Sequence, residues 1–161
     1  MLRIFYLLEN FFKDAYKEVS VRQYAKEMKL SPPTASKILK EFEKENLLLS
    51  AKKGIYIYFR PNKDSLLFQG LAKLYWQNIL FNETAELHKQ VLFRKIVLFG
   101  SIAKAENTLN SDVDLYVDVE RKSLDAAKIE KKLKRKIQLH FRDSMKNPHL
   151  KKNIEKGIEI R

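Results

Sequence analysis

The stretch that decides the fold is Val97-Leu98-Phe99-Gly100-Ser101, followed after ten residues by Asp112-Val113-Asp114. Residues 96–99 are consecutive apolar residues, which predict a buried strand that ends at Gly100. Residues 113–119 alternate between apolar and polar side chains and predict the next strand. Asp112 and Asp114 are two positions apart and therefore lie on one face of it.

These residue types suit the binding of a phosphorylated ligand. Gly100 allows a backbone to approach a ligand closely, and Ser101 offers a hydroxyl and a helix N-cap, where N–H groups meet phosphate oxygens. Two carboxylates, those of Asp112 and Asp114, suit Mg²⁺, which commonly bridges protein oxygens to substrate phosphates. The alternative is an ordinary strand-to-helix turn followed by aspartates on a solvated edge strand.

A glycine-serine pair, ten residues and an aspartate-x-aspartate strand together resemble the DNA polymerase beta-like nucleotidyltransferase superfamily, and within it the minimal nucleotidyltransferases of archaea and bacteria. The resemblance covers about residues 94–161. It implies that Asp112 and Asp114 are catalytic residues and ligands of Mg²⁺, and that Gly100 and Ser101 hold the triphosphate of ATP or another NTP. It also implies transfer of a nucleoside monophosphate to a hydroxyl, and an antitoxin role with a HEPN-type toxin as partner.

The chain departs from that pattern in the turn helix and on the third strand. The superfamily often has an arginine after Gly-Ser and a glycine three residues later, where this chain has Ile102 and Ala105. Lys104 would then supply the positive charge beside the phosphates. The third carboxylate of the superfamily falls on Gln138, which carries no charge for Mg²⁺ and cannot act as a base. His140 shares the strand parity of Gln138 and is either a substitute base or a structural residue.

Two functions therefore remain open. One is an active nucleotidyltransferase, and the other is a regulator whose degenerate transferase domain binds a nucleotide or a protein partner.

Charge and composition restrict the partners. The 161 residues carry a net charge of +12 with a pI near 9.7, which indicates a polyanionic partner such as nucleic acid, a nucleotide or an anionic membrane. The chain has no cysteine, which excludes disulfides and thiolate metal sites. It also lacks a signal-peptide pattern and an 18-residue apolar stretch, so we expect a cytoplasmic protein without membrane contact.

The N-terminal part predicts helices followed by a hairpin. Residues 2–16 place apolar side chains at helical spacing, Ser20 caps a second helix, and Ser31-Pro32 opens a third. Residues 47–59 then predict a β-hairpin with a basic tip. Residues 2–60 resemble the winged helix-turn-helix domains of archaeal and bacterial regulators, and we assign residues 1–62 to this domain.

The resemblance implies duplex DNA as a partner. A protein-interaction or architectural module is the alternative. The candidate DNA contacts are small hydroxyl and basic residues near the start of the third helix and at the hairpin tip: Thr34, Ser36, Lys37, Lys40, Lys52 and Lys53.

Residues 63–93 predict a helical connector, with one long helix through residue 81 and a second through about residue 93. Leu67, Leu71, Leu74 and Tyr75 lie on one stripe of the long helix, and further apolar residues widen it. The surplus of apolar surface on this helix either forms a homodimer interface or packs within the chain.

The pattern of residues 94–161 predicts a small domain built on a β-sheet. A basic amphipathic helix is expected over residues 121–136, a third strand over 136–141, a last helix over 148–156 and an apolar tail over 157–160. The fold class is a two-domain α+β or α/β protein: a winged helix-turn-helix, a helical connector and a small nucleotidyltransferase-like α/β sheet domain.

Overall fold

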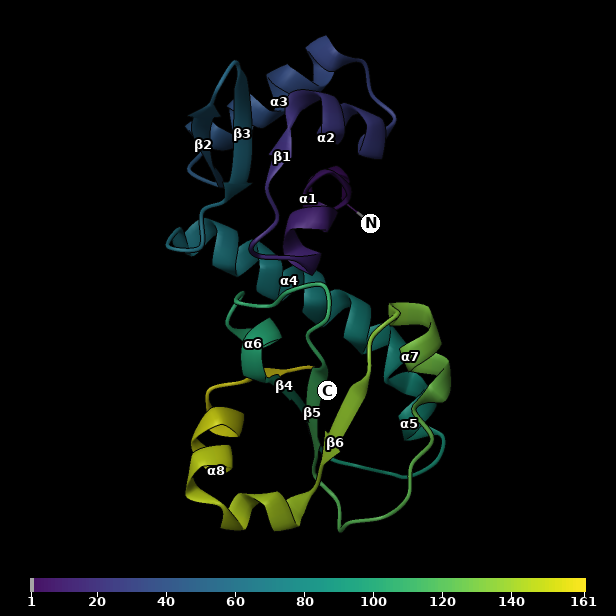
Figure 1. Cartoon of the computed structure of the whole chain (residues 1–161). Coiled ribbons are helices and arrows are strands. Elements are labelled where there is room, and N and C mark those ends of the chain that lie inside the picture. Colours follow the sequence, from purple (N-terminus) through teal and green to yellow (C-terminus); the bar gives the residue numbers. More distant parts are fainter. Residues whose placement is uncertain (1) are drawn as a thin grey trace. The chain divides into compact units, whose positions relative to one another are not determined.

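The computed structural model of the chain describes residues 2–161 (Figure 1). The chain divides into two compact units, Met1–Ala72 and Lys73–Arg161. The division falls inside the long helix α4 (Leu66–Glu83), so the predicted connector is shared between the units. Within residues 2–161 no helix is both long and apolar enough to cross a membrane.

The first unit contains three helices, a three-stranded sheet and the start of α4. Strand β3 lies in the middle of this sheet and pairs antiparallel with both β1 and β2. The elements before α4 are α1 (Arg3–Lys13), β1 (Val19–Ser20), α2 (Val21–Met28), α3 (Pro32–Lys44), β2 (Leu48–Lys53) and β3 (Tyr56–Pro61).

The starts of α2 and α3 follow the capping signals in the sequence. The Ser20 hydroxyl accepts from the Gln23 N–H, and the Gln23 side chain accepts from the Ser20 N–H, which completes a capping box. The Ser31 hydroxyl accepts from the Thr34 N–H at the start of α3. The buried face of α3 is the predicted one: Ala35, Ile38, Leu39 and Phe42.

Two expectations for this unit are wrong. The first helix ends at Lys13, and the side chains of Leu2 and Tyr16, at the two ends of the apolar pattern over residues 2–16, are exposed. The segment between the first two predicted helices, for which no strand was expected, forms β1, in which Val19 aligns with Phe59. A two-residue strand has no periodicity of its own, because its partner lies 40 positions away in the chain.

The second unit is built on a mixed four-stranded sheet of order β6-β5-β4-β7. Strands β5 and β6 are parallel, and β4 runs antiparallel to both β5 and β7. The elements after α4 are α5 (Ala85–His88), β4 (Ile96–Phe99), α6 (Gly100–Ala103), β5 (Val113–Val117), α7 (Ala127–Leu133), β6 (Ile137–His140), the 3₁₀ helix η1 (Arg142–Lys146), α8 (Pro148–Glu155) and β7 (Ile158–Glu159).

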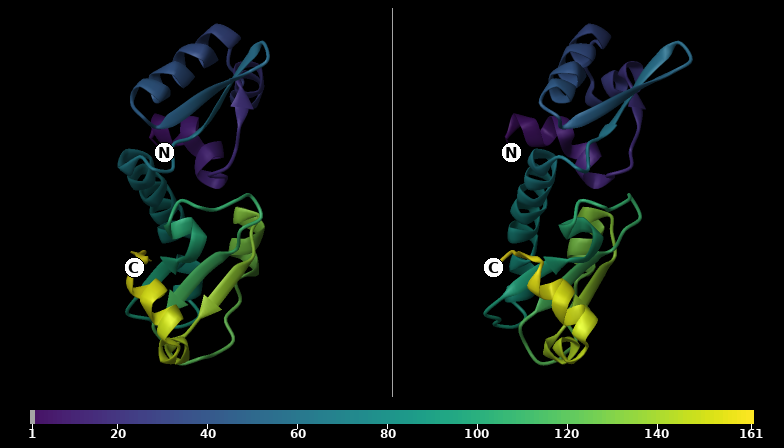
Figure 2. Two further views of the ribbon diagram at one scale, coloured as in Figure 1. Left: turned by 60° about the vertical axis from the view of Figure 1, so that its left-hand side comes forward. Right: turned by 90° about the vertical axis from the view of Figure 1, so that its left-hand side faces the viewer.

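Helix α8 covers one face of this sheet (Figure 2). On that face Val97, Phe99 and Tyr116 form a buried cluster with Ile154 of α8. Asp114 lies on the same face, because it aligns with Phe99 across the β4–β5 pair. The apolar cluster therefore packs the sheet directly beside the paired carboxylates.

The stripe predicted for the long helix is wrong in part. Leu67 and Leu74 are 51% and 54% exposed, whereas Tyr75 is buried as expected. A helix that is apolar around most of its circumference has no single periodic face, so the sequence does not show which side packs. The buried side chains of α4 are Phe68, Ala72, Tyr75, Trp76 and Leu80.

Other boundaries also differ from expectation. The second connector helix is only one turn, α5, and the basic helix begins at Ala127 rather than at residue 121. The apolar tail forms β7, which aligns Ile158 with Leu98 at the edge of the sheet. This pairing gives backbone partners to a segment that is too short to predict a strand from its sequence alone.

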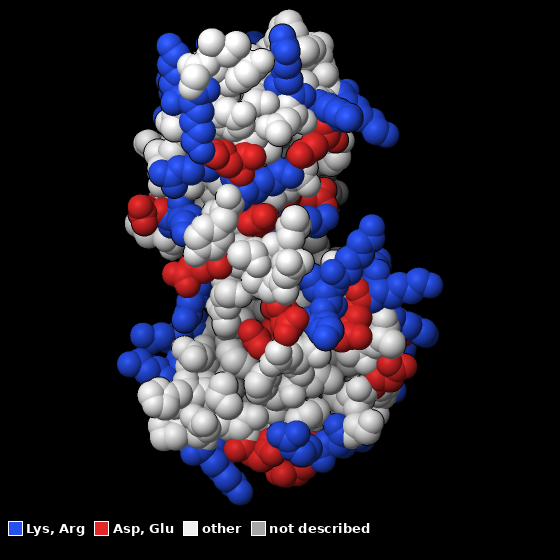
Figure 3. Space-filling model, in the orientation of Figure 1, with Lys and Arg blue, Asp and Glu red and all other residues white. Residues whose placement is uncertain are grey.

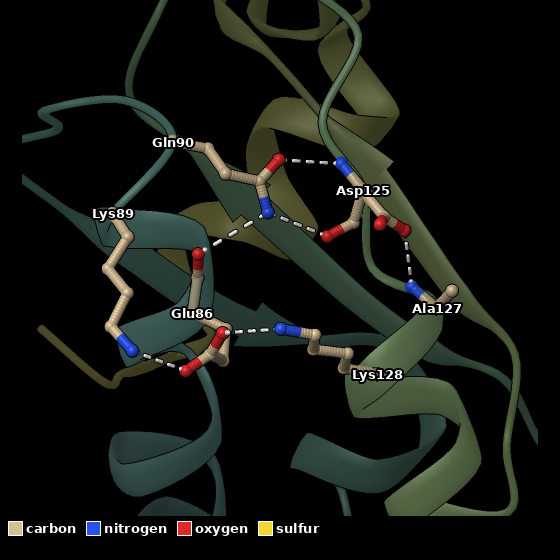
Figure 4. A network of polar contacts seen from close by, with 6 residues as sticks. All are labelled: Glu86, Lys89, Gln90, Asp125, Ala127 and Lys128. Atoms are coloured by element: carbon tan, nitrogen blue, oxygen red, sulfur yellow. Dashed lines mark hydrogen bonds and ion pairs between the residues drawn. The ribbon is translucent and has the colours of Figure 1, made fainter.

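A polar network sets the start of α7 (Figure 4). The Gln90 amide accepts from the Asp125 N–H and donates to the Asp125 carbonyl, both at 2.8 Å. The Asp125 carboxylate accepts from the Ala127 N–H at 2.9 Å, and Glu86 of α5 pairs with Lys128 at 3.7 Å. These bonds hold residues 125–128, and with them the start of α7, against the α5 region.

Candidate active site

Gly100 and Asp114 come into direct contact where β4 ends. Gly100 has φ +76°, a conformation that side chains with a Cβ rarely adopt, and a Cβ built on it would lie 2.2 Å from Oδ2 of Asp114. Only glycine leaves room for the carboxylate at this position. The fold therefore brings the two halves of the motif together.

Asp112, Asp114 and Gln138 form a polar group across β5 and β6. Both aspartates are half-buried, and Gln138 of β6 aligns with Asp114. The Gln138 Nε2 donates to Asp112 Oδ2 at 2.7 Å. Gln138, on the third strand of the motif, thus lies beside the carboxylate pair, but it contributes an amide donor and not a carboxylate.

His140 lies next to the same carboxylates. Its Nε2 is 3.8 Å from Asp114 Oδ1, and its ring meets the ring of Phe99 at a centroid distance of 4.9 Å. This Nε2 is buried and has no hydrogen-bond partner within residues 2–161. This nitrogen is therefore able to form a hydrogen bond with a group that binds beside Asp114.

Helix α6 is a single turn, and Ser101 is not its N-cap as expected. The cap residue is Phe99, and Ser101 lies half-buried inside the turn. Lys104 ends the turn with an exposed side chain, and Ala105 follows with φ +55°. Ala105 therefore holds a left-handed conformation at the position where the superfamily often has glycine.

The residues present fit a divalent cation that is shared with a substrate. No group of three or more His, Cys, Asp or Glu side chains capable of holding a metal ion is found in residues 2–161. Two carboxylates are nevertheless a sufficient protein contribution for Mg²⁺, which commonly completes its shell with substrate phosphates and water. The glycine cradle around Asp114 and the unpartnered His140 nitrogen agree with such a shared site.

A pocket beside Asp112 was missed by the sequence reasoning. Its volume is about 320 Å³, and its lining residues are Leu109, Asn110, Asp112, Lys134, Arg135 and Lys136. The guanidinium of Arg135 donates to the carbonyls of Thr108 and Ser111, at 2.9 and 2.5 Å. The run of three basic residues ends the segment 121–136, whose sequence is compatible with a solvated basic face or with a surface for a nucleic acid or an acidic partner.

The candidate DNA contacts lie in the first unit and differ in their surroundings. Lys37, Lys40 and Lys52 are exposed, whereas Ser36 is half-buried. Two others already have partners: the Thr34 hydroxyl lies 2.7 Å from that of Ser31, and Lys53 forms an ion pair with Glu18 at 2.5 Å. Lysine and arginine side chains are prominent over the β2–β3 hairpin (Figure 3).

Comparison with known proteins identifies two relatives of the chain. The chain is 32% identical over 89 residues to one protein of Methanocaldococcus jannaschii, MJ1379, and 31% identical over 88 residues to another, MJ0126. Both are named as putative protein adenylyltransferases. The matches cover 47% and 51% of this chain, and 89% and 90% of the relatives. No solved structure matches the chain.

A family model described as "Nucleotidyltransferase domain" matches residues 79–160, which include β4, the Gly100–Ser101 turn and the Asp112–Asp114 strand. The match therefore covers the elements that build the candidate site. This chain belongs to the nucleotidyltransferase domain family.

Proposed function

We propose that the protein transfers an adenylyl group from ATP to a hydroxyl group of a protein acceptor. The observation that carries this proposal is the contact of Gly100 with the Asp114 carboxylate, where a Cβ would lie 2.2 Å from Oδ2. A phosphate-binding turn and a carboxylate pair that lie this close can act on one triphosphate. Two relatives that carry the name putative protein adenylyltransferase support the choice of a protein as acceptor.

Asp112 and Asp114 would hold the divalent cation, with Gly100 and Ser101 facing the triphosphate. When bound, Mg²⁺ neutralises charge that develops on the phosphoryl oxygens. Lys104 is exposed at the end of the same turn and adds positive charge on the phosphate side. Because Gly100 has no side chain, its backbone can approach a phosphate closely while Asp114 keeps its position.

In the proposed reaction, the acceptor hydroxyl oxygen forms a bond to the α-phosphorus, and the bond from that phosphorus to the bridging oxygen breaks. Pyrophosphate leaves with the electron pair, and the hydroxyl proton passes to a base. Gln138 cannot take this proton. The unpartnered Nε2 of His140, 3.8 Å from Asp114, is the nearest candidate to do so.

A specific observation also favours the second function. Gln138 stands at the position of the third carboxylate, and its amide donates a hydrogen bond to Asp112. The site therefore offers less negative charge to Mg²⁺. In this alternative the protein is a DNA-binding regulator. Its nucleotidyltransferase domain binds the nucleotide but does not transfer the adenylyl group efficiently. Slow or absent transfer by a protein that binds Mg·ATP would support it.

The first experiment measures Mg·ATP binding by calorimetry and transfer of label from α-³²P-ATP in parallel. Asp112→Asn and Asp114→Asn should each weaken Mg·ATP binding by at least about tenfold, because each removes a charged ligand. Asp64→Asn, at an exposed aspartate of the first unit, is the matched control. Unchanged Mg·ATP binding in both site variants would contradict the proposal.

For the first unit we propose a winged helix-turn-helix that binds duplex DNA. The order of α2, α3 and the β2–β3 hairpin supports this assignment, as do the exposed side chains of Lys37, Lys40 and Lys52. The net charge of +12 favours a polyanion. Together the units suit an antitoxin-like regulator whose acceptor is a HEPN-type toxin, and label transfer to such a partner would test that role.

A further inference from the structure

The sheet order places the pocket on one side of the carboxylates and the Gly100 turn on the other. Gly100 continues β4, whereas Lys136 directly precedes β6, and β5 with its aspartates runs between these strands. In phosphoryl transfer the attacking and leaving oxygens lie roughly in line on opposite sides of the phosphorus. If the leaving pyrophosphate is held on the β4 side, the acceptor hydroxyl approaches from the β6 side.

We propose that the pocket beside Asp112 is the acceptor subsite and receives an acidic segment of the protein acceptor. This inference rests on the adenylyl transfer proposed above and specifies its substrate class. The pocket volume of about 320 Å³ is enough for one or two side chains of a bound segment. Three basic residues line it against one carboxylate, Asp112, so it favours an anionic occupant.

Lys134 and Lys136 supply the positive charge that attracts the acidic segment. Both side chains are exposed, and neither forms an ion pair with any residue from 2 to 161. On the preceding helix α7, by contrast, Lys128 and Lys132 are paired with Glu86 and Glu83. Figure 3 shows basic atoms near the start of β6 beside acidic atoms over the start of β5.

A backbone hydrogen bond joins the pocket wall to β5, the strand that carries Asp114. The Val113 N–H donates to the Lys136 carbonyl at 2.8 Å, between the two aspartates in sequence. Arg135 is a positioning residue, since its guanidinium holds the carbonyls of Thr108 and Ser111 in the facing loop. An acidic segment bound here would therefore lie at a constant distance from Asp112.

The test uses the full chain and two fluorescent peptides, Glu-Glu-Tyr-Glu-Glu and Gln-Gln-Tyr-Gln-Gln, with binding followed by anisotropy. The site variant is Lys134→Glu with Lys136→Glu. The control is Lys152→Glu with Lys156→Glu, two exposed lysines near the end of α8 that give the same change in net charge. Mg·ATP binding is measured for all three proteins.

We expect the wild type to prefer the glutamate peptide, and the site variant to bind it about tenfold more weakly than the control variant does. Mg·ATP binding by the two variants should agree within about twofold. An equal loss of peptide binding in both variants would show only general charge attraction and would overturn the inference. A loss of Mg·ATP binding confined to the site variant would make the pocket a phosphate subsite and would also overturn it.

A single-stranded RNA oligonucleotide serves as a further probe. RNA binding that depends on Lys134 and Lys136, without a peptide preference, would overturn the inference in favour of a nucleic-acid acceptor. Failure of the wild type to bind Mg·ATP would overturn the proposed function itself. Normal Mg·ATP binding without the peptide preference would overturn the acceptor subsite alone.

Discussion

Gly100 controls the geometry of the candidate site through the absence of a side chain. Gly100→Ala should displace the Asp114 carboxylate, because the new Cβ would lie 2.2 Å from Oδ2 and φ is +76°. The left-handed conformation alone costs about 1–2 kcal/mol for alanine. We expect Mg·ATP binding to be lost in calorimetry and the free energy of unfolding to fall by about 2 kcal/mol or more in urea titrations.

Gly70→Ala is the matched control for that substitution. Gly70 lies inside α4, and a Cβ there meets nothing within 4 Å. Alanine is favoured over glycine in a helix by about 1 kcal/mol, so this variant should be more stable and should bind Mg·ATP normally. A loss of stability in both variants would contradict the steric explanation for Gly100.

Gln138 is the residue at which the two proposed functions, active transfer and nucleotide binding alone, make different predictions. Gln138→Asp places a carboxylate beside Asp112 and should raise label transfer from α-³²P-ATP, by about 10²–10⁴-fold if it acts as the base. Gln138→Asn keeps an amide and should not raise the rate. Fast transfer by the wild type would contradict the degenerate function, and His140→Ala would then test the substitute base.

At the scale of elements, Asp118 ties the end of β5 to η1. The hydrogen bond from Arg142 to the Asp118 carboxylate, at 2.8 Å, holds the pKa of this carboxyl below its ordinary value, and a bond from Tyr116 adds to the effect. A lowered pKa in the folded state means that this stabilisation is complete above the ordinary pKa of about 4. It is lost as the pH falls through the folded-state pKa.

Asp118→Asn should therefore be less stable than the wild type at pH 7, and this difference should shrink progressively below pH 4. Urea unfolding at several pH values measures this difference in the free energy of unfolding. Asp64→Asn, an exposed aspartate outside the sheet, is the control. A difference between wild type and Asp118→Asn that stays constant down to pH 2.5, roughly the end of the useful range, would show that the Arg142 contact does not stabilise the fold.

For the whole molecule, DNA binding is tested by salt dependence. Lys37→Ala with Lys40→Ala should weaken duplex binding and reduce the slope of log K against log salt by about 1.8, if both side chains contact phosphates. Lys53 is the internal comparison because it is paired with Glu18, and Lys53→Ala should have a smaller effect. Absence of salt-sensitive duplex binding by the wild type would remove the DNA-binding proposal.

Self-association is the second test for the whole molecule. Leu67 and Leu74 lie seven residues apart on α4 and are both about half exposed, so we propose that this face forms a homodimer. Sedimentation should give a dimer at about tens of micromolar, and Leu67→Glu with Leu74→Glu should give a monomer. Leu92→Glu, at a leucine that is 83% exposed, should not change the mass. A monomeric wild type would contradict the proposal.

The local elements with strong signals could be predicted from the sequence. Ser20 and Ser31 mark helix starts because their hydroxyls satisfy nearby N–H groups, and that chemistry is local. The apolar run at residues 96–99 forms β4 because four consecutive apolar side chains require burial on both faces. The motif spacing likewise predicted that Gly100 and Asp114 belong to one site.

Features that depend on distant partners were decided only by the tertiary structure. Strands β1 and β7 exist because Phe59 and Leu98 offer them backbone partners far away in the chain. The buried side of α4 depends on what packs against it, since apolar residues surround most of this helix. The pocket beside Asp112 arises because parallel pairing of β5 and β6 brings Lys136 next to residues about 24 positions earlier, which no local pattern encodes.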